Sequence, residues 1–143
     1  ELAARALAGT PIAAVTGSNG KTTTTALLGE MLKAAGLRTG VGGNIGEHSA
    51  SHLALAGGWD AVVLELSSFQ LEGCTTLRPR AAALLNRSAD HLDRHGSLDT
   101  YLALKARIFQ AQTAADHAIL NADDPALATV STRSRVARFS LRA

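Results

Sequence analysis

The residues best suited to chemistry form a glycine-rich segment that ends in a lysine and a threonine. It reads Thr16-Gly17-Ser18-Asn19-Gly20-Lys21-Thr22. Its small residues leave backbone N–H groups exposed to an anion, Lys21 can reach terminal phosphates, and the Thr22 hydroxyl can bind Mg²⁺. The general P-loop motif has another glycine where this chain has Val15, so this is the shorter Gly-x-x-Gly-Lys-Thr form. The alternative is a glycine-rich turn with a solvated lysine. The predicted phosphate-binding residues are Gly17, Ser18, Asn19, Gly20, Lys21, Thr22 and Thr23.

A carboxylate stands near the end of the apolar run at residues 61–66, which is typical of a parallel strand covered on both faces. An unpaired Glu65 in such a strand would be costly to bury, and a metal ion would remove that cost. The phosphate loop should lie near the same sheet edge, so we predict that Glu65 and Thr22 bind Mg²⁺. The alternative is that this strand lies at the edge of the sheet, where Glu65 would face water.

A histidine follows the next apolar run, at residues 81–85, and therefore lies on the same side of the predicted sheet. His91 has Asp90 beside it, and a neutral imidazole with a carboxylate to orient it could be a metal ligand. Isolated histidines are more often surface or capping residues, and the local sequence leaves both interpretations open. His95 stands next to Gly96 and fits a turn.

A lysine interrupts the apolar face of a later helix. Lys105 shares that face with Tyr101, Leu104, Ile108 and Phe109, and has no acidic neighbour at helical spacing. Periodicity favours a lysine whose stem packs while its ammonium reaches water. The alternative is a desolvated, uncharged amine, which CO₂ could convert to a carbamate.

Apolar runs alternate with helix-like segments along the chain, and the loops at Gly17, Asn44, Ser67, Asn86 and Asn121 all follow predicted strands. This alternation indicates an α/β fold, a mostly parallel sheet with helices on both faces, whose ligands bind beyond the carboxyl ends of the strands. The predicted strands cover residues 12–16, 38–41, 61–66, 81–85, 118–120 and 136–139, and helices cover 21–35, a segment ending near 55, 97–111 and a segment starting at Pro125.

Composition excludes several classes of protein. The chain has 143 residues, which suits one domain, and with 46% hydrophobic but only 3% aromatic residues its core must be aliphatic. Its basic residues are scattered and the net charge is +2, so nucleic-acid binding is not predicted. Cys74 is the single cysteine, which fits a reducing cytosol. No apolar run approaches membrane-spanning length. We therefore expect a cytoplasmic monomer without membrane partners.

Taken together, these segments resemble the Mur ligase family. Two markers in the order of that family are Gly42-Gly43-Asn44-Ile45-Gly46 and Lys105-Ala106-Arg107-Ile108, in addition to the phosphate loop. The loop is shared with folylpolyglutamate synthases. Two others, Leu64-Glu65-Leu66-Ser67-Ser68-Phe69-Gln70-Leu71 and Asp90-His91-Leu92-Asp93-Arg94-His95, resemble the branch of the family that adds D-glutamate.

The resemblance implies a P-loop NTPase-like central domain of an ATP-dependent amide ligase in peptidoglycan synthesis. Its substrates would be UDP-N-acetylmuramoyl-L-alanine and D-glutamate, joined through an acyl phosphate. Lys21 would bind phosphate, and Thr22 with Glu65 would hold one Mg²⁺. His91 and a carbamylated Lys105 would serve a second Mg²⁺, which reverses the interpretation from periodicity. The implied catalytic residues are Lys21, His91 and Lys105, and the implied substrate contacts are Asn44, Ser67 and His91.

The family pattern also divides the chain. We expect residues 1–10 to be the end of an interdomain linker and residues 11–143 to be a central ATP-binding domain that is incomplete at its C-terminus, so that the fragment alone is inactive. The sequence is also compatible with three rival functions: a folylpolyglutamate synthase-like ligase, a nucleotide-binding module without catalysis, and a generic P-loop phosphotransferase.

Overall fold

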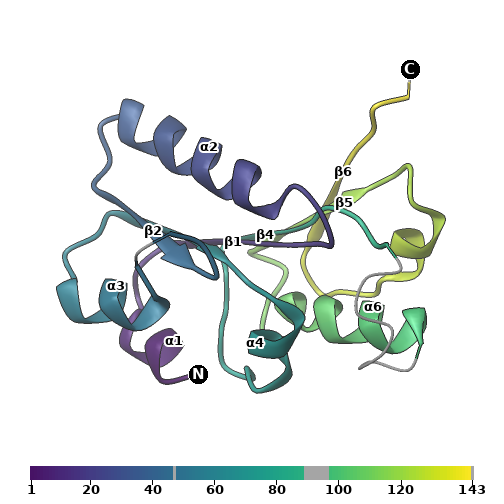
Figure 1. Ribbon diagram of the computed structural model, residues 1–143, viewed down its shortest axis with the longest axis horizontal. Helices are drawn as coiled ribbons and strands as arrows, with labels where there is room; N and C mark the ends of the chain where they lie inside the picture. Colours follow the sequence, from purple (N-terminus) through teal and green to yellow (C-terminus); the bar gives the residue numbers. More distant parts are fainter. Residues whose placement is uncertain (47, 89–96, 143) are drawn as a thin grey trace.

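The computed structural model describes residues 1–46, 48–88 and 97–142. In this part of the chain, six parallel strands form one sheet in the order β2-β3-β1-β4-β5-β6 (Figure 1). The predicted parallel sheet is therefore confirmed. The strands are β1 (Ile12–Thr16), β2 (Thr39–Gly43), β3 (Ala61–Glu65), β4 (Ala81–Leu84), β5 (His117–Asn121) and β6 (Arg135–Phe139).

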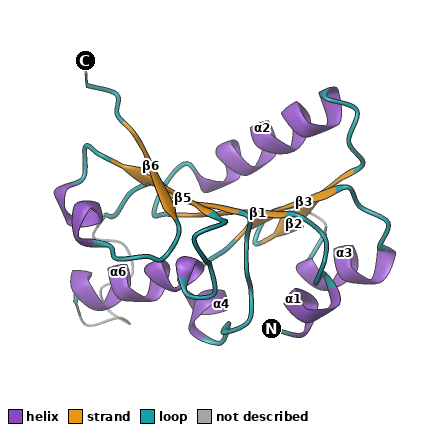
Figure 2. Cartoon of the chain, turned by 180° about the vertical axis from the view of Figure 1, so that it is seen from behind, coloured by secondary structure: helices purple, strands orange, loops and turns teal. Residues whose placement is uncertain are grey.

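Helices cover both faces of the sheet, as expected from the sequence. Figures 1 and 2 show α2 (Lys21–Ala34) alone on one face, and α1 (Leu2–Ala6), α3 (Ala50–Ala56), α4 (Ser68–Glu72) and α6 (Leu98–Ala106) on the other. Two short 3₁₀ helices, Arg107–Phe109 and Pro125–Thr129, complete the layer. No helix in the described ranges is long and apolar enough to cross a membrane.

The core is aliphatic, because the central strands supply small and branched side chains rather than rings. Val62 and Leu84 are fully buried, and β3 is buried along its whole length. One glycine fixes the distance between α2 and the sheet: a Cβ on Gly29 would stand 2.4 Å from Cγ2 of Val41. A residue with a side chain at that position would push α2 away from β2.

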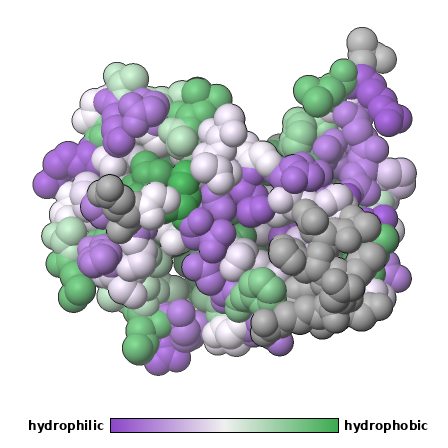
Figure 3. All heavy atoms as spheres, viewed as in Figure 1, coloured by the Kyte–Doolittle hydropathy of each residue, from purple (hydrophilic) through white to green (hydrophobic). Residues whose placement is uncertain are grey.

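The outer strand β6 pairs with β5 on one side only, within the described part of the chain. Four of its five residues are exposed, including Val136. The chain then leaves the body of the molecule, as Figure 1 shows. On the face shown in Figure 3, hydrophobic and hydrophilic residues are interspersed. Among the described residues, β6 is therefore an edge strand, as β2 is at the other end of the strand order.

Element boundaries differ from the sequence prediction at a few places. Strand β2 extends to Gly43, because bare glycines let the main chain of His48 approach closely; a Cβ on Gly42 would lie 2.1 Å from the His48 oxygen. The helix predicted to run to residue 111 ends at Ala106 and continues as a 3₁₀ turn. The short helix α4 was not predicted, although Ser67 and Gln70 form a capping box at its start.

Candidate functional site

The glycine-rich loop joins β1 to α2 at the carboxyl end of the central strands. Gly20 is the N-cap of α2 and has φ of +77°, a conformation that favours glycine because it has no Cβ. No side chain of the described residues caps this helix. The first backbone N–H groups of α2 have no partner within the helix, and together with the helix dipole they are suited to an anion. Thr23 lies in this first turn.

Glu65 is the best-enclosed acidic group of the site, with 2% of its surface exposed. The Thr22 hydroxyl donates to Oε2 at 2.8 Å, and the Asn44 side-chain amide donates to Oε1 at 3.2 Å. Strand β3 lies between β2 and β1. The alternative in which Glu65 faces water from an edge strand is therefore wrong.

A second glycine brings Asn44 to this carboxylate. Gly43 has φ of +101°, and a Cβ there would lie 2.3 Å from the main-chain oxygen of Glu65. The backbone N–H of Asn44 donates to that same oxygen at 2.9 Å. The turn that follows β2 can thus pass directly over the end of β3, which places both the backbone and the side chain of Asn44 on Glu65.

The residues around Glu65 fit a divalent cation. A carboxylate and a hydroxyl are the oxygen ligands that Mg²⁺ prefers, and in the described residues no basic side chain forms a salt bridge with Glu65. Thr22 and Glu65 would therefore offer two oxygen ligands to such a cation, and their binding of Mg²⁺ stays a prediction. No group of three or more His, Cys, Asp or Glu residues suited to a metal occurs in the described ranges. His91 and Asp90 lie outside the described residues, so the second metal site stays a prediction.

Lys105 is buried, with 2% of its surface exposed. Its ammonium nitrogen Nζ donates to the main-chain oxygen of Gly17 at 2.8 Å and lies 4.5 Å from the centre of the Tyr101 ring. The interpretation that its ammonium reaches water is therefore wrong, because the side chain is buried and Nζ is directed at the phosphate loop. Lys21 reaches the same loop, and its Nζ donates to the main-chain oxygen of Ser18 at 2.8 Å.

The side chains of Lys21 and Lys105 line a cavity of about 160 Å³. Ser67 also lies there, at the N-cap of α4, where its hydroxyl accepts from the Gln70 backbone N–H at 3.3 Å. The structure thus brings together the predicted lysines, Asn44 and Ser67 around one space beside Glu65. The residues that line the cavity are Lys21, Asn44, Ser67, Ser68, Phe69, Tyr101 and Lys105.

The sequence reasoning did not assign a role to Asn86, which follows β4. Its side-chain oxygen accepts from the backbone N–H groups of Ser18 and Asn19, at 3.0 Å and 2.9 Å. The available signal was its position directly after a strand, at the sheet edge that carries the loop. Asn121 follows the next strand in the same way and instead donates to the Leu85 main-chain oxygen at 3.0 Å.

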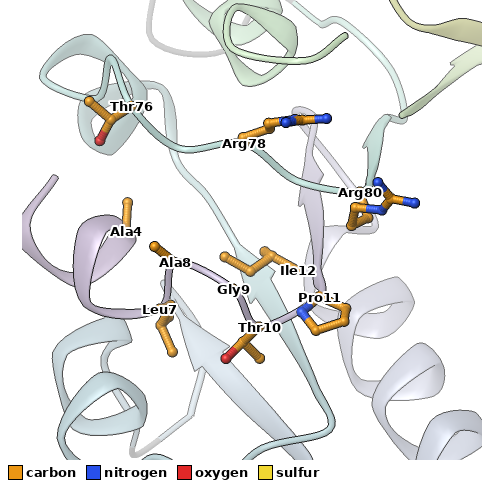
Figure 4. Close-up of a pocket in the computed structure, with 10 residues that line it drawn as sticks. All are labelled: Ala4, Leu7, Ala8, Gly9, Thr10, Pro11, Ile12, Thr76, Arg78 and Arg80. Carbon is orange, nitrogen blue, oxygen red and sulfur yellow. The ribbon is translucent and has the colours of Figure 1, made fainter. Parts of the chain in front are cut away.

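A larger pocket of about 550 Å³ lies at the amino-terminal ends of β1 and β4. It is bounded by the end of α1 and by the segment before β4 (Figure 4). Arg78 and Arg80 line it, and both form ion pairs with buried Asp116, at 2.8 Å and 3.5 Å. Burial alone would raise the pKa of Asp116, but hydrogen bonds from Arg78 and Thr113 outweigh it and lower that pKa. None of the predicted site residues lines this pocket.

Comparisons with known proteins agree with this arrangement. The chain is 52% identical over 134 residues to a UDP-N-acetylmuramoylalanine–D-glutamate ligase of Pelotomaculum thermopropionicum, covering 92% of the chain and 30% of that relative. A MurF ligase from Thermotoga maritima, solved in complex with ADP, has a TM-score of 0.79 at 26% identity, over 99% of this chain and 36% of that one.

Escherichia coli FolC, in complex with DHPP and ADP, has a TM-score of 0.75 at 20% identity, over 96% of this chain and 44% of that chain. At this identity the likeness shows the fold alone. The family model described as "Mur ligase middle domain" matches residues 15–143. The phosphate loop, the buried Glu65 and strands β2 to β6 fall within that range, and the match begins inside β1, at residue 15. The chain therefore belongs to the Mur ligase family, as its middle domain.

Proposed function

We propose that this chain is the ATP-binding part of a longer amide ligase that adds D-glutamate to UDP-N-acetylmuramoyl-L-alanine. The observation that carries the proposal is the convergence of Lys21, Thr22, Glu65 and Lys105 at the carboxyl edge of the sheet. The relatives at about half identity support the choice of substrates, because they are named as D-glutamate ligases. The chain spans about 30% of the length of the first of these.

The proposed reaction has two transfers. An oxygen of the substrate carboxylate attacks the γ-phosphorus of ATP, the bond to the bridging oxygen breaks, and ADP leaves. The amine nitrogen of D-glutamate then attacks the acyl carbon of the acyl phosphate. Phosphate leaves, the nitrogen loses a proton, and an amide remains. Most of the catalysis in such a reaction comes from positioning the phosphates and stabilising their charge.

The chain supplies positive groups for this charge. The N–H groups at the start of α2 receive the phosphates, which is the usual use of an uncapped helix N-terminus. In the structure Lys21 Nζ donates a hydrogen bond to the Ser18 main-chain oxygen at 2.8 Å. A change of its side-chain torsion angles would bring the ammonium to a terminal phosphate. An ammonium near the γ-phosphate stabilises the negative charge there during transfer.

Thr22 and Glu65 would hold one Mg²⁺ beside the phosphates, and the family resemblance adds a second Mg²⁺ at His91 and a carbamylated Lys105. When bound, these ions neutralise phosphate charge and align the two reactants. The short contact between the Thr22 hydroxyl and Glu65 keeps both oxygen groups on the same side of the loop. Glu65 would also orient the Asn44 side chain, because its Oε1 accepts a hydrogen bond from the Asn44 side-chain amide at 3.2 Å.

The muramoyl substrate would enter next to the cavity that Asn44 and Ser67 line. The Asn44 amide nitrogen has a second N–H, which can donate a hydrogen bond near the reacting carboxylate while the first stays on Glu65. Ser67 is a weaker candidate because its hydroxyl already caps α4. His91, the third proposed substrate contact, lies outside the described residues. We expect the reaction in the cytoplasm, where ATP and UDP-linked precursors are available.

A folylpolyglutamate synthase is the second candidate, because the phosphate loop at residues 16–22 also resembles that of folylpolyglutamate synthases. The names of the relatives at about half identity favour the D-glutamate ligase instead. A binding module without catalysis would also use the phosphate loop, but it would need neither His91 nor Lys105 beside a metal site. The two rivals differ from the main proposal in substrate dependence.

The test uses the intact protein that contains this chain. Phosphate release from ATP should require both UDP-N-acetylmuramoyl-L-alanine and D-glutamate, with either substrate alone giving background rates. L-Lysine in place of D-glutamate, and a folate in place of the nucleotide-sugar, are the matched controls. Equal stimulation by either control would overturn the assignment, and ATP binding without any turnover would favour the binding module.

A further inference from the structure

The asparagine after β4 holds the phosphate loop through all the polar groups of its side chain. Asn86 Oδ1 accepts from the backbone N–H groups of Ser18 and Asn19, and Nδ2 donates to the main-chain oxygen of Asn19 at 3.0 Å. A side-chain amide offers one acceptor oxygen with two lone pairs and one nitrogen with two donors. Three of these four positions are directed at two consecutive residues of the loop.

Main-chain contacts fix the same stretch. The backbone N–H of Ser18 also lies 3.2 Å from the main-chain oxygen of Asn86, and the Ser18 hydroxyl accepts from the backbone N–H of Ser88 at 2.9 Å. A Cβ on Gly17 would lie 3.1 Å from Cβ of Leu85. The loop therefore packs closely against the exit of β4 at Gly17, and a side chain there would require Leu85 to shift.

These contacts divide the donors of the loop into two groups. The N–H groups of Ser18 and Asn19 are directed at Asn86, whereas those at the start of α2 have no side-chain cap among the described residues. A glycine-rich loop is otherwise costly to order, and a loop that is already ordered loses less entropy when it binds an anion. Asn86 thus separates the residues that hold the loop from those that receive the phosphate.

We propose that Asn86 is a positioning residue for the nucleotide: it holds Ser18 and Asn19 so that the N–H groups at the start of α2 converge on the β-phosphate. The proposal rests on the proposed function, since it requires a nucleotide at this loop. Asn86 acts through the loop and does not touch the reacting atoms. Replacing Asn86 should weaken the binding of ligands that carry a β-phosphate. The binding of ligands without a β-phosphate should be unchanged.

Asn121 supplies a matched control on the neighbouring strand. It also follows a strand at this edge, and its side-chain nitrogen donates to the Leu85 main-chain oxygen at 3.0 Å. Its side chain bonds the main-chain oxygen of Leu85 and the backbone N–H of Asp123, and within the described ranges it forms no hydrogen bond with the loop at residues 17–20. Asn121→Ala therefore removes a comparable hydrogen bond near β4 but keeps the hydrogen bonds between Asn86 and the loop.

The experiment measures ADP and AMP binding by calorimetry in the full-length ligase and in Asn86→Ala and Asn121→Ala. Removing two or three hydrogen bonds from the loop should weaken ADP binding in Asn86→Ala by about tenfold or more. AMP binding should be unchanged in that variant, and Asn121→Ala should match the parent protein for both ligands. If Asn86→Ala does not fold, Asn86→Ser keeps a polar residue at the strand exit and takes its place.

Amide hydrogen exchange gives an independent readout. The amides of Ser18 and Asn19 should exchange faster in Asn86→Ala, whereas the amide of Leu66, which donates to Val15 in the neighbouring strand, should keep its rate. Unchanged ADP affinity would overturn the proposal, and so would equal losses for ADP and AMP with a lower melting temperature. A parent protein that binds neither nucleotide would instead refute the proposed function, and the positioning role with it.

Discussion

The side-chain nitrogen of Lys105 lies 2.8 Å from the main-chain oxygen of Gly17, a contact that joins α6 to the phosphate loop across 88 positions of the chain. The same nitrogen lies 4.5 Å from the centre of the Tyr101 ring. A carbonyl and an aromatic face both attract a cation. The contact brings a lysine with little exposed surface to the loop that is proposed to bind the nucleotide, which is where a modified lysine would act.

Carbamylation of Lys105 can be tested directly. With ¹³C-labelled bicarbonate near neutral pH, NMR should show a carbamate signal that is absent in Lys105→Ala. Lys33→Ala is the matched control, because Lys33 lies on the solvent side of α2 and pairs with Glu30 at 2.8 Å. The signal should persist in that control. Its absence from the unsubstituted protein would mean that Lys105 acts as an unmodified ammonium.

Replacing Glu65 should uncouple Mg²⁺ from nucleotide binding. Glu65→Gln keeps the shape and one acceptor oxygen but removes the negative charge beside Thr22, so Mg²⁺-dependent ADP affinity should fall by at least about tenfold. Titration calorimetry with and without Mg²⁺ measures the change, and Glu30→Gln on the exposed face of α2 provides the control. A fall in melting temperature without any loss of Mg²⁺ dependence would make Glu65 a structural residue.

The close approach of α2 to β2 predicts a stability defect far from the site. Gly29→Ala should destabilise the fold by about 1–3 kcal/mol, since the new Cβ would stand 2.4 Å from Val41 Cγ2 and the helix would have to move. Alanine favours helix by about 1 kcal/mol over glycine, which offsets part of this cost.

Denaturant unfolding of the single and double variants measures the coupling. In a Val41→Ala background the added Cβ has space, so Gly29→Ala should be less costly there than in the unsubstituted chain. Equal costs in both backgrounds would show that the contact with Val41 is not the cause.

Asp116 should make the free energy of unfolding decrease at acidic pH. Its folded-state pKa is lowered from the ordinary 3.8, so its contribution to stability is fully present above about 3.8 and is lost as the pH falls through the folded-state pKa. Asp116→Asn removes this titration, and the variant should lose less stability than the parent between pH 4 and its acid transition. Unfolding at several pH values checks the slope, and Asp99→Asn, at an exposed carboxylate, should leave it unchanged.

Local patterns predicted the strands, α2 and the carboxylate of the site, because each depends on neighbouring residues. An apolar run followed by small residues and a lysine indicates a strand, a phosphate loop and a helix. Glu65 stood out because it interrupts such a run. The interior position of β3, which decides that Glu65 is buried, follows from the strand order and thus from contacts between distant segments.

The partners of Asn86 and Lys105 could not be predicted from periodicity. Asn86 and Asn121 have the same local setting, yet only Asn86 reaches the loop, 68 positions away from Ser18. For Lys105, periodicity identified an apolar helix face but not what that face packs against. Helix α4 has five residues and was too short for periodicity, although its capping box was readable from Ser67 and Gln70.

The exposed strand β6 affects how this chain behaves at high concentration. A strand with unpaired outer N–H and C=O groups can add the strand of another molecule, which leads to aggregation. Arg135 and Arg138 on β6 are both exposed, and like charges on two such edges repel each other when the edges meet. Solubility of the chain should therefore decrease as salt screens these arginines, which makes low ionic strength the better condition for handling it.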